Sequence, residues 1–531
     1  MFLPALSFIV LYIVGVTHGF SIVQPTGQLR HAISPIQPTK SVRLSSTTTP
    51  TIGESTNTLP TSSSALRDLR VAVVGGGPSG LLLAHRLLKS GARVTVLEGR
   101  GDPRDEANGA LDGRAYALGV GMRGRTAIRS VDESLWDAIK QRGFESEKFT
   151  LFINTIPIVL RNGRQDSDQE PSLLMYQSDL CAAMIDELEE RFSPSQLDLR
   201  FDAPVEDCDV FSKTVRLEST TGRSVELGPF DLVVGCDGVN SPVRTSLEAV
   251  SDRFESVRTD LPGIFKVVRL QETPEKLDPT TVALMLPKSG SIGAFIEPTA
   301  RGSCILFNAR NATDTDVVIA PSQNDISATA TALEERFPLL AGADFDDMAR
   351  QLANQRGGRA ATVDCNTYHF GSSVALCGDA AHATGGITGQ GVNSALIDAQ
   401  VLVDSLEAVY DPNAKEDTLA SALLAYSQQQ VPEGKALYDL SLGPKPKGAF
   451  KRVRLLFGTA IDSLFRGRLG IGNKPLQTEL TTTMTPFSEI RKRKDKYFDK
   501  PFGDPTEPLA AIAEQDMMEM QAKTGSTILK R

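Results

Sequence analysis

Residues 70–98 read RVAVVGGGPSGLLLAHRLLKSGARVTVLE, and this stretch decides the fold. A β-branched strand leads through a glycine-rich turn into a Leu/Ala-rich helix, and a second β-branched strand ends in an acid, which predicts one complete βαβ unit. Gly75 allows the tight turn, Gly77 lets the backbone approach a pyrophosphate, and Gly80 permits close packing of helix on strand. Glu98 lies about where an acid meets a ribose diol. The unit therefore predicts dinucleotide binding; the alternative is a glycine turn that serves packing alone.

Strand-like stretches outside this unit indicate a second domain. Residues 148–176 and 263–308 are alternating and aromatic, which favours antiparallel strands over further βαβ repeats. Two buried strands end in Asp237-Gly238 and in Gly378-Asp379. We therefore expect a discontinuous dinucleotide-binding domain with a second sheet domain inserted into it. The expected boundaries are 67–145, 230–260 and 365–410 for the binding domain, 146–229 and 261–364 for the inserted sheet domain, 411–500 for a C-terminal helical region and 501–531 for a flexible tail.

Composition excludes several classes of function. The 531 residues carry 56 Lys and Arg against 65 Asp and Glu, and such an acidic chain is a poor match to phosphate polyanions, which argues against general nucleic-acid binding. The six cysteines form no C-x-x-C pair and the five histidines are scattered. We therefore expect neither a disulfide framework nor a metal site, and we expect the cysteines to be small buried hydrophobic residues.

The start of the chain differs in composition from the rest. Residues 2–16 are almost all apolar, long enough for a signal-peptide core and short for a bilayer span. Residues 20–66 are rich in Ser, Thr and Pro, and basic residues outnumber acids, as in a disordered transit segment. We expect a cleaved signal peptide over 1–19, a transit-like segment over 20–66, a plastid location and no transmembrane anchor in the mature chain. The alternatives are secretion and, because no Lys or Arg precedes the apolar run, an uncleaved anchor.

The order of the glycine and acid landmarks resembles that of the single-component FAD-dependent aromatic hydroxylases, and the motifs are closest to the kynurenine 3-monooxygenases. The matching runs are 71–80, Gly113-Arg114, Arg123-Gly124-Arg125, 231–244, 378–393, 436–442, Pro475-Leu476 and Pro486-Phe487-Ser488-Glu489. The resemblance implies an α/β fold with an α+β insert: a Rossmann-type FAD-binding domain, a β-sheet substrate domain and a C-terminal helical portion. It implies FAD as cofactor, NADPH or NADH as co-substrate, and hydroxylation or epoxidation of a small apolar or aromatic substrate by O2.

Single residues also receive roles, some from the βαβ motif and the rest from the resemblance. The residues expected to bind FAD are Gly75, Gly77, Ser79, Gly80, Glu98, Gly99, Arg100, Arg114, Gln177, Asp237, Asp379, Gly389, Gly391, Val392 and Asn393. Asp379 is expected to bond the ribityl chain, and Gln177 stands where the closest relatives have an arginine. The N–H groups at 392–393 are expected to face the flavin, where a helix amino terminus stabilises negative charge. No catalytic side chain is assigned: His382 and Gly386 are expected beside the flavin, with His382 in a structural role.

The substrate-binding positions depart from the kynurenine hydroxylases, which hold the amino-acid head group with an Arg, two Tyr and an Asn. The match puts in these places Leu151, Gln165, Pro444 and Gln477. A buried carboxylate without its arginine is strongly disfavoured, so we expect kynurenine not to be the substrate. Leu151, together with Phe149 and Phe152, favours a more apolar ligand, although on a strand some of these side chains fill the core.

Three further interpretations stay open. A reductase of the geranylgeranyl reductase type is less consistent with the sequence, because those enzymes usually lack a histidine equivalent to His382 and have Gly-Glu-Gly where this chain has 389–391. A flavin-binding redox protein without turnover is the second, prompted by Gly386 and Gln177. The third is peripheral membrane contact through a basic cluster, for which a solvated helix face is the simpler interpretation. The cluster comprises Lys445, Lys447, Lys451, Arg452 and Arg454.

Overall fold

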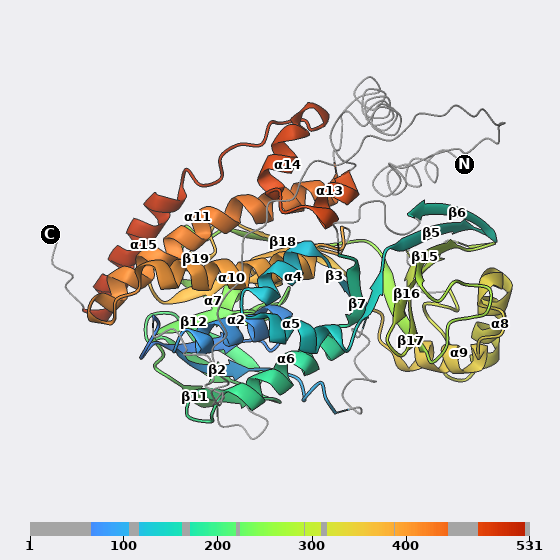
Figure 1. Cartoon of the computed structure of the whole chain (residues 1–531). Coiled ribbons are helices and arrows are strands. Elements are labelled where there is room, and N and C mark those ends of the chain that lie inside the picture. Colours follow the sequence, from blue (N-terminus) through green and yellow to red (C-terminus); the bar gives the residue numbers. More distant parts are fainter. Residues whose placement is uncertain are drawn as a thin grey trace, which may run out of the picture.

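The centre of the molecule is a six-stranded sheet in the order β19-β20-β12-β1-β2-β8 (Figure 1). The computed structural model describes residues 65–105, 116–161, 170–218, 224–290, 292–309, 316–386, 388–443 and 476–525. The strands of the sheet are β19 (His369–Phe370), β20 (Val374–Leu376), β12 (Leu232–Gly235), β1 (Arg70–Val74), β2 (Arg93–Leu97) and β8 (Leu197–Arg200). Neighbouring strands pair parallel except β19 with β20. The predicted Rossmann-type α/β domain is confirmed.

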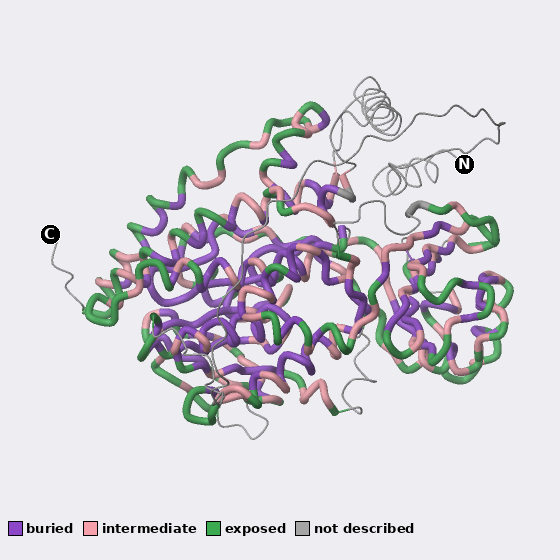
Figure 2. Tube along the Cα trace, in the orientation of Figure 1, coloured by how far each residue is buried: buried purple, intermediate pink, exposed green. Residues whose placement is uncertain are grey.

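Helices pack around this sheet and bury its strands. The helices are α2 (Pro78–Lys89), α4 (Met122–Arg129), α5 (Glu133–Lys140), α6 (Gln177–Arg191), α7 (Pro242–Val250), α10 (Gly391–Val409) and α11 (Lys415–Leu442). α2 contacts α6 and α10, and α10 in turn contacts α11. All residues of α2 except Lys89 are buried, because neighbours enclose the helix on several sides. Figure 2 shows the buried trace running through the middle of this domain.

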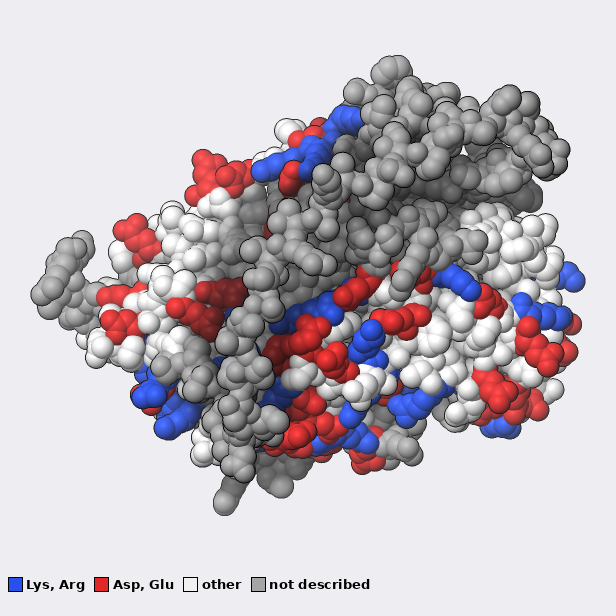
Figure 3. Space-filling model, in the orientation of Figure 1, with Lys and Arg blue, Asp and Glu red and all other residues white. Residues whose placement is uncertain are grey.

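Charges of both signs cover the outer face of α5 and α6 (Figure 3). Arg104 pairs with Asp186 and Glu189 of α6, and Arg191 pairs with Asp132 at the start of α5. Because each cation here has an acidic neighbour, this face offers no basic stripe to a polyanion.

The substrate domain is a second six-stranded sheet, seen on the right of Figure 1. Its strands, in order, are β14 (Ile264–Leu270), β17 (Gly302–Ala309), β16 (Ile292–Thr299), β15 (Thr281–Leu286), β5 (Lys148–Ile153) and β6 (Ile156–Arg161). Neighbours are antiparallel except β15 with β5. One face packs against α8 (Ile326–Arg336) and α9 (Phe345–Asn354) through a core that includes Ile305, Phe307 and Leu333. The other face turns toward the domain of the central sheet, because Cys304 and Val267 on it cluster with Ala117.

Smaller sheets and the C-terminal helices complete the fold. The three-stranded sheets are β3 (Ala117–Val120), β7 (Ser172–Tyr176) and β4 (Phe144–Ser146); β11 (Val225–Leu227), β10 (Thr214–Leu217) and β9 (Val205–Asp209); and β13 (Ser256–Asp260), β18 (Ala361–Cys365) and β21 (His382–Thr384). The last helices are α13 (Leu476–Thr482), α14 (Phe487–Arg493) and α15 (Leu509–Thr524). Among the described residues, no helix is long and apolar enough to cross a membrane.

Three expected boundaries need correction. β8 and α6 fall in the segment 146–229 that was assigned to the inserted sheet, yet β8 pairs with β2 and α6 packs on α2. The segment 501–531 was expected to be a flexible tail, but α15 buries Leu509 and Met520 against the protein. Leu66 was placed in the transit segment, but its side chain is fully buried and its N–H donates to the Ser90 carbonyl at 2.8 Å. The signal peptide and the rest of the transit segment lie outside the described residues.

Candidate active site

The glycine-rich turn after β1 has the shape of an anion cradle. Gly75 has a φ of +103°, and a Cβ there would lie 2.4 Å from the Cys236 carbonyl oxygen. A Cβ on Gly80 would lie 2.0 Å from the Gly75 carbonyl oxygen, so the helix packs on the turn as the motif predicts. A Cβ on Gly77 would meet no atom within 4 Å. No side chain caps α2 at Gly77, so space and free N–H groups coincide where a pyrophosphate would bind.

Glu98 fixes this turn from the neighbouring strand. Its carboxylate accepts the Gly76 N–H at 2.7 Å and the Arg100 N–H at 2.9 Å. The Arg100 guanidinium also donates to Glu98 at 2.9 Å, and more than half of the Arg100 side chain is exposed. A carboxylate has about four acceptor positions, so Glu98 retains capacity for a ribose hydroxyl. Gly99 follows with Pro204 close to it, since a Cβ on Gly99 would lie 3.3 Å from Pro204.

Two acids lie at the carboxyl ends of the neighbouring parallel strands β12 and β20, the edge at which open α/β sheets bind ligands. Asp237 Oδ2 accepts the Val243 N–H at 3.1 Å, whereas its buried Oδ1 has no hydrogen-bond partner in the structure. Burial raises the pKa of Asp237 to about 6. The Asp379 side chain, in the short helix η2 (Gly378–Ala380), is exposed. Burial of its surroundings still raises the pKa of that carboxyl, because desolvation disfavours its charged form.

The amino terminus of α10 lies next to the same edge. The Ser79 hydroxyl of α2 donates to the Ala395 carbonyl of α10 at 3.1 Å. Gly389, with a φ of +66°, and Gln390 lead into the helix at Gly391, and no side chain caps its first turn. The backbone N–H groups of Gly391 and Val392 are therefore open to a negatively charged partner.

The Asn393 side chain connects elements of the protein, whereas the open N–H groups are available to a ligand. It is buried, accepts the Gly121 N–H at 2.8 Å and donates to the Gly119 carbonyl at 3.0 Å. Asn393 therefore ties α10 to the turn between β3 and α4, and only its backbone N–H remains for a cofactor.

A buried ion pair supports the acid-bearing loop, and the sequence reasoning missed half of it. His382 Nε2 lies 2.6 Å from Asp398 Oδ2 of α10, and the same oxygen accepts the Gly378 N–H at 3.0 Å. The Tyr368 ring stacks on His382 with the centroids 5.5 Å apart. Burial acts to lower the pKa of His382, but Asp398 outweighs it and the pKa is raised. These contacts place His382 in a structural network. In the sequence, the one feature that pointed to Asp398 was its position as an acidic residue within an apolar helix.

The remaining assigned residues lie around this edge or outside the described chain. Gln177 is the first residue of α6, and its N–H donates to the Tyr116 carbonyl at 3.3 Å. Gly386 has a φ of +75°, and a Cβ there would meet no atom within 4 Å. Arg114 lies outside the described residues, as do Gln165, Pro444 and the basic cluster.

The face of the substrate sheet that turns toward this edge is largely apolar. Leu151 is buried and lies in one row with Leu284, Phe295 and Leu306 across four strands. Phe149 lies on the same face, with its ring 6.1 Å from that of Phe295. Phe152 points to the opposite face, so it belongs to the core there and not to the ligand wall.

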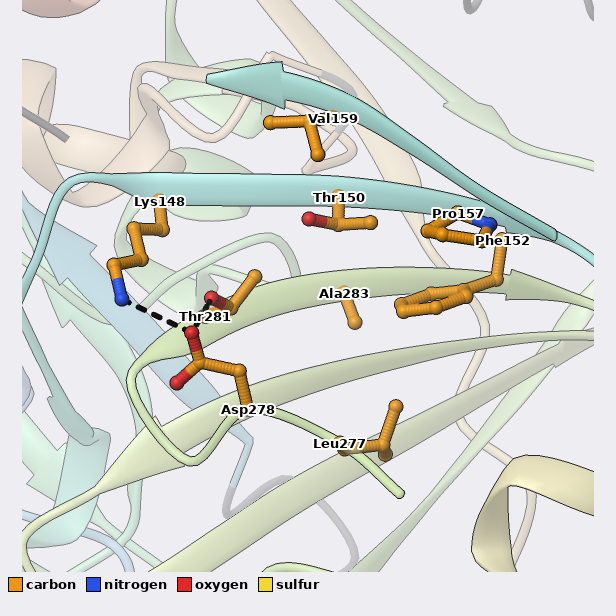
Figure 4. Close-up of a pocket in the computed structure, with 9 residues that line it drawn as sticks. All are labelled: Lys148, Thr150, Phe152, Pro157, Val159, Leu277, Asp278, Thr281 and Ala283. Carbon is orange, nitrogen blue, oxygen red and sulfur yellow. Dashed lines mark hydrogen bonds and ion pairs between the residues drawn. The ribbon is translucent and has the colours of Figure 1, made fainter. Parts of the chain in front are cut away.

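The face opposite the site carries a shallow hollow beside Phe152 (Figure 4). In it the Lys148 ammonium donates to Asp278 at 3.0 Å. The hollow is lined by Lys148, Thr150, Phe152, Pro157, Val159, Leu277, Asp278, Thr281 and Ala283. None of these is an assigned cofactor residue, so the hollow is separate from the candidate site.

Two polar residues on the inner face were also missed. Arg269 of β14 and Glu297 of β16 both pair with Cys304 of the intervening strand β17. Their sequence context gives little signal, because Glu297 is the one charge in β16 and Arg269 shares β14 with Lys266 in a mainly apolar strand. Only the strand register brings them into one row.

Known proteins resemble the chain over most of its length. A family model described as FAD binding domain matches residues 68–441. The chain is 28% identical over 438 residues to kynurenine 3-monooxygenase of Salinispora tropica, covering 80% of this chain and 92% of that protein. It is 27% identical over 361 residues to violacein synthase of Chromobacterium violaceum, covering 64% and 77%.

A solved structure shares the fold. The tetrameric form of 2-methyl-3-hydroxypyridine-5-carboxylic acid oxygenase aligns with a TM-score of 0.56 at 21% identity, covering 78% of this chain and 96% of that chain. The cradle at Gly77 and the Asp237 oxygen without a hydrogen-bond partner fit the pyrophosphate portion of FAD, and the open end of α10 fits its ring. The chain therefore belongs to the FAD binding domain family and is an FAD-dependent monooxygenase.

Proposed function

We propose that this monooxygenase takes electrons from NADPH or NADH and transfers one atom of O2 to a small apolar or aromatic substrate other than kynurenine. The observation that carries the proposal is the inner wall of the substrate sheet, where buried Leu151 stands in a row of apolar side chains. The relatives named kynurenine 3-monooxygenase support the reaction type. Their substrate does not carry over, because Leu151 cannot pair with a carboxylate.

The residues of the chain bind and place the reactants. Bound FAD supplies the reducible ring that activates oxygen, which side chains cannot do. The turn at 75–80 and Asp237 would hold its pyrophosphate region, and Asp379 its ribityl chain. The amino terminus of α10 would stabilise negative charge on the ring. The His382–Asp398 pair fixes the backbone beside Asp379, and the apolar wall excludes water from the reacting centre.

The direct test uses the protein from residue 65 onward. We expect one noncovalently bound FAD per chain, measured by absorbance after desalting. A panel of plastid isoprenoids and phenols is then screened for faster NADPH and NADH oxidation, with 18O2 present. Incorporation of one 18O atom into a panel compound supports the proposal. NAD(P)H-driven reduction of a double bond without oxygen uptake would instead identify a reductase, and absence of flavin reduction would identify a protein without turnover.

We also propose that the protein enters plastids, on the strength of the apolar stretch at 2–16 followed by the hydroxylated stretch at 20–66. A fluorescent protein fused after residue 66 should accumulate in the plastid, and Phe20→Lys should divert it to the secretory pathway. Secretion of the unaltered fusion would overturn the location and leave the enzymatic proposal intact.

A further inference from the structure

Glu297 is a carboxylic acid on the inner, apolar face of the substrate sheet. Along β16, Ile296 packs into the core beneath α8 and α9, so the next residue points to the opposite face. Glu297 pairs with Cys304, and Cys304 Sγ accepts the Ala117 N–H of β3 at 3.4 Å. The row therefore lies against the FAD-binding domain, where β7 meets β16 (Figure 1).

The carboxyl of Glu297 has no partner in the part of the chain that the structure describes. It is partly exposed, yet it makes no hydrogen bond or ion pair with the described residues. Burial alone raises the pKa of Glu297 to about 8. Because burial disfavours the charged form of a carboxyl, the raised pKa favours the protonated form of Glu297 at neutral pH, and this form can donate one hydrogen bond.

The groups around Glu297 do not titrate near neutral pH. Burial raises the pKa of Cys304 on β17 to about 12, and burial also raises the pKa of Tyr176 on β7. Arg269 on β14 lies over the Tyr176 ring, 4.4 Å from its centroid, and its buried Nη2 has no hydrogen-bond partner among the described residues. β15, the other neighbour, has no titratable side chain. Glu297 is therefore the group of this row that changes charge between about pH 6.5 and 9.5.

We propose that Glu297 determines substrate specificity by donating a hydrogen bond to a neutral carbonyl oxygen of an aromatic substrate. The inference rests on the proposed function and names the substrate class for the same site. Phe295 and Phe149 supply an apolar surface for an aromatic ring, and Glu297 lies two residues along β16 from Phe295 on the same face. A ligand that accepts a hydrogen bond from this donor binds more tightly than a ligand that leaves the donor unpaired.

The test compares two neutral probes that differ in one group: 4-aminoacetophenone, which has the carbonyl, and 4-ethylaniline, which has a methylene instead. Each is titrated into the FAD-loaded protein at about pH 6.5 and about pH 9.5, and binding is followed by the change in flavin absorbance. At the lower pH we expect the ketone to bind about tenfold more tightly. At the higher pH the preference should disappear, because ionised Glu297 cannot donate.

Variants separate this role from a structural one. Glu297→Gln keeps a donor that does not titrate, so it should prefer the ketone at both pH values, whereas Glu297→Ala should show no preference at either. Glu272→Gln, an exposed carboxyl in the same domain, should behave as wild type. Bound FAD in each variant shows that it is folded.

The proposal is overturned if the wild-type preference is independent of pH, if Glu297→Ala retains it, or if neither probe binds. The same preparations are tested for FAD reduction by NADPH. If the flavin is not reduced, the proposed function fails. If it is reduced and the preference is absent, only the role of Glu297 fails.

Discussion

The cofactor end of the central sheet and the inner face of the substrate sheet are built from different parts of the polypeptide. At the cofactor end the groups open to a ligand are mainly backbone groups, in the turn at 75–80 and the first turn of α10. On the substrate sheet the backbone is occupied by strand pairing, so side chains such as Leu151 and Glu297 are the groups left for a ligand. A site built from backbone groups requires glycine at a few positions. A site built from side chains can bind a different ligand after one of those side chains is substituted. Cofactor binding and substrate selectivity should therefore be separable.

The largest effect is expected at the glycine turn. Gly80→Ala should lower both stability and FAD affinity, because its Cβ would lie 2.0 Å from the Gly75 carbonyl. Gly77→Ala should leave the melting temperature of the FAD-free protein unchanged, since its Cβ meets no atom within 4 Å. It should still lower FAD affinity about 100-fold by filling the cradle. Fluorescence titration with FAD and thermal melting measure both. Full affinity in Gly77→Ala would show that the pyrophosphate binds elsewhere.

A smaller loss is expected from the buried pair that supports the cofactor end. Asp398→Asn should reduce the free energy of unfolding by about 2–4 kcal/mol, because it removes the charge opposite buried His382. Asp417→Asn, at an exposed position of α11, is the matched control and should change it by less than about 0.5 kcal/mol. Urea denaturation measures both. Equal stability of the two variants would contradict a supporting role for the pair.

Stability should also depend on pH through Asp516 of α15. Burial raises the pKa of this carboxyl to about 7, above its ordinary value of 3.8. The contribution of Asp516 to the free energy of unfolding is therefore fully present below about pH 3.8, and it is lost as the pH rises through about 7. Asp516→Asn should stabilise the protein at about pH 8 by roughly 1–3 kcal/mol. The exposed Glu514→Gln on the same helix should not. Thermal melting of the variants and the wild type at two pH values measures these effects. Equal melting temperatures of Asp516→Asn and wild type at the higher pH would refute the prediction.

The smallest effect is expected at Arg100. Its side chain is more than half exposed, and it pairs with Glu98 at 2.9 Å. Exposed ion pairs contribute little, and the Gly76 N–H still holds Glu98 in place. Arg100→Ala should therefore weaken FAD binding by less than about threefold, measured by the same fluorescence titration. A loss comparable to that of Gly77→Ala would mean that Arg100 contacts the cofactor directly.

The cofactor end was predictable because its signals are local. The turn and the acid Glu98 lie within one βαβ unit, and Asp237 and Asp379 each follow directly after a buried strand. The carboxyl ends of parallel strands share one edge, so such residues assemble without knowledge of distant contacts.

The features that the sequence did not predict depend on contacts between residues far apart in the chain. Asp398 matters because it meets His382, and Arg269 and Glu297 share a row only through the register of β14, β16 and β17. β8 was misassigned for the same reason, since its place is decided by pairing with β2. A sequence pattern gives the face of a strand but not its neighbours.

Whether kynurenine is a substrate can be measured directly. The FAD-loaded protein is incubated with NADPH, O2 and kynurenine, and a bona fide kynurenine hydroxylase is run alongside. We predict that the flavin is reduced and oxygen is consumed while no 3-hydroxykynurenine is detected by chromatography, because Leu151 leaves the carboxylate unpaired. Turnover comparable to that of the reference enzyme would contradict the account and would show that another cation on the inner face, Arg269 first among them, binds the head group.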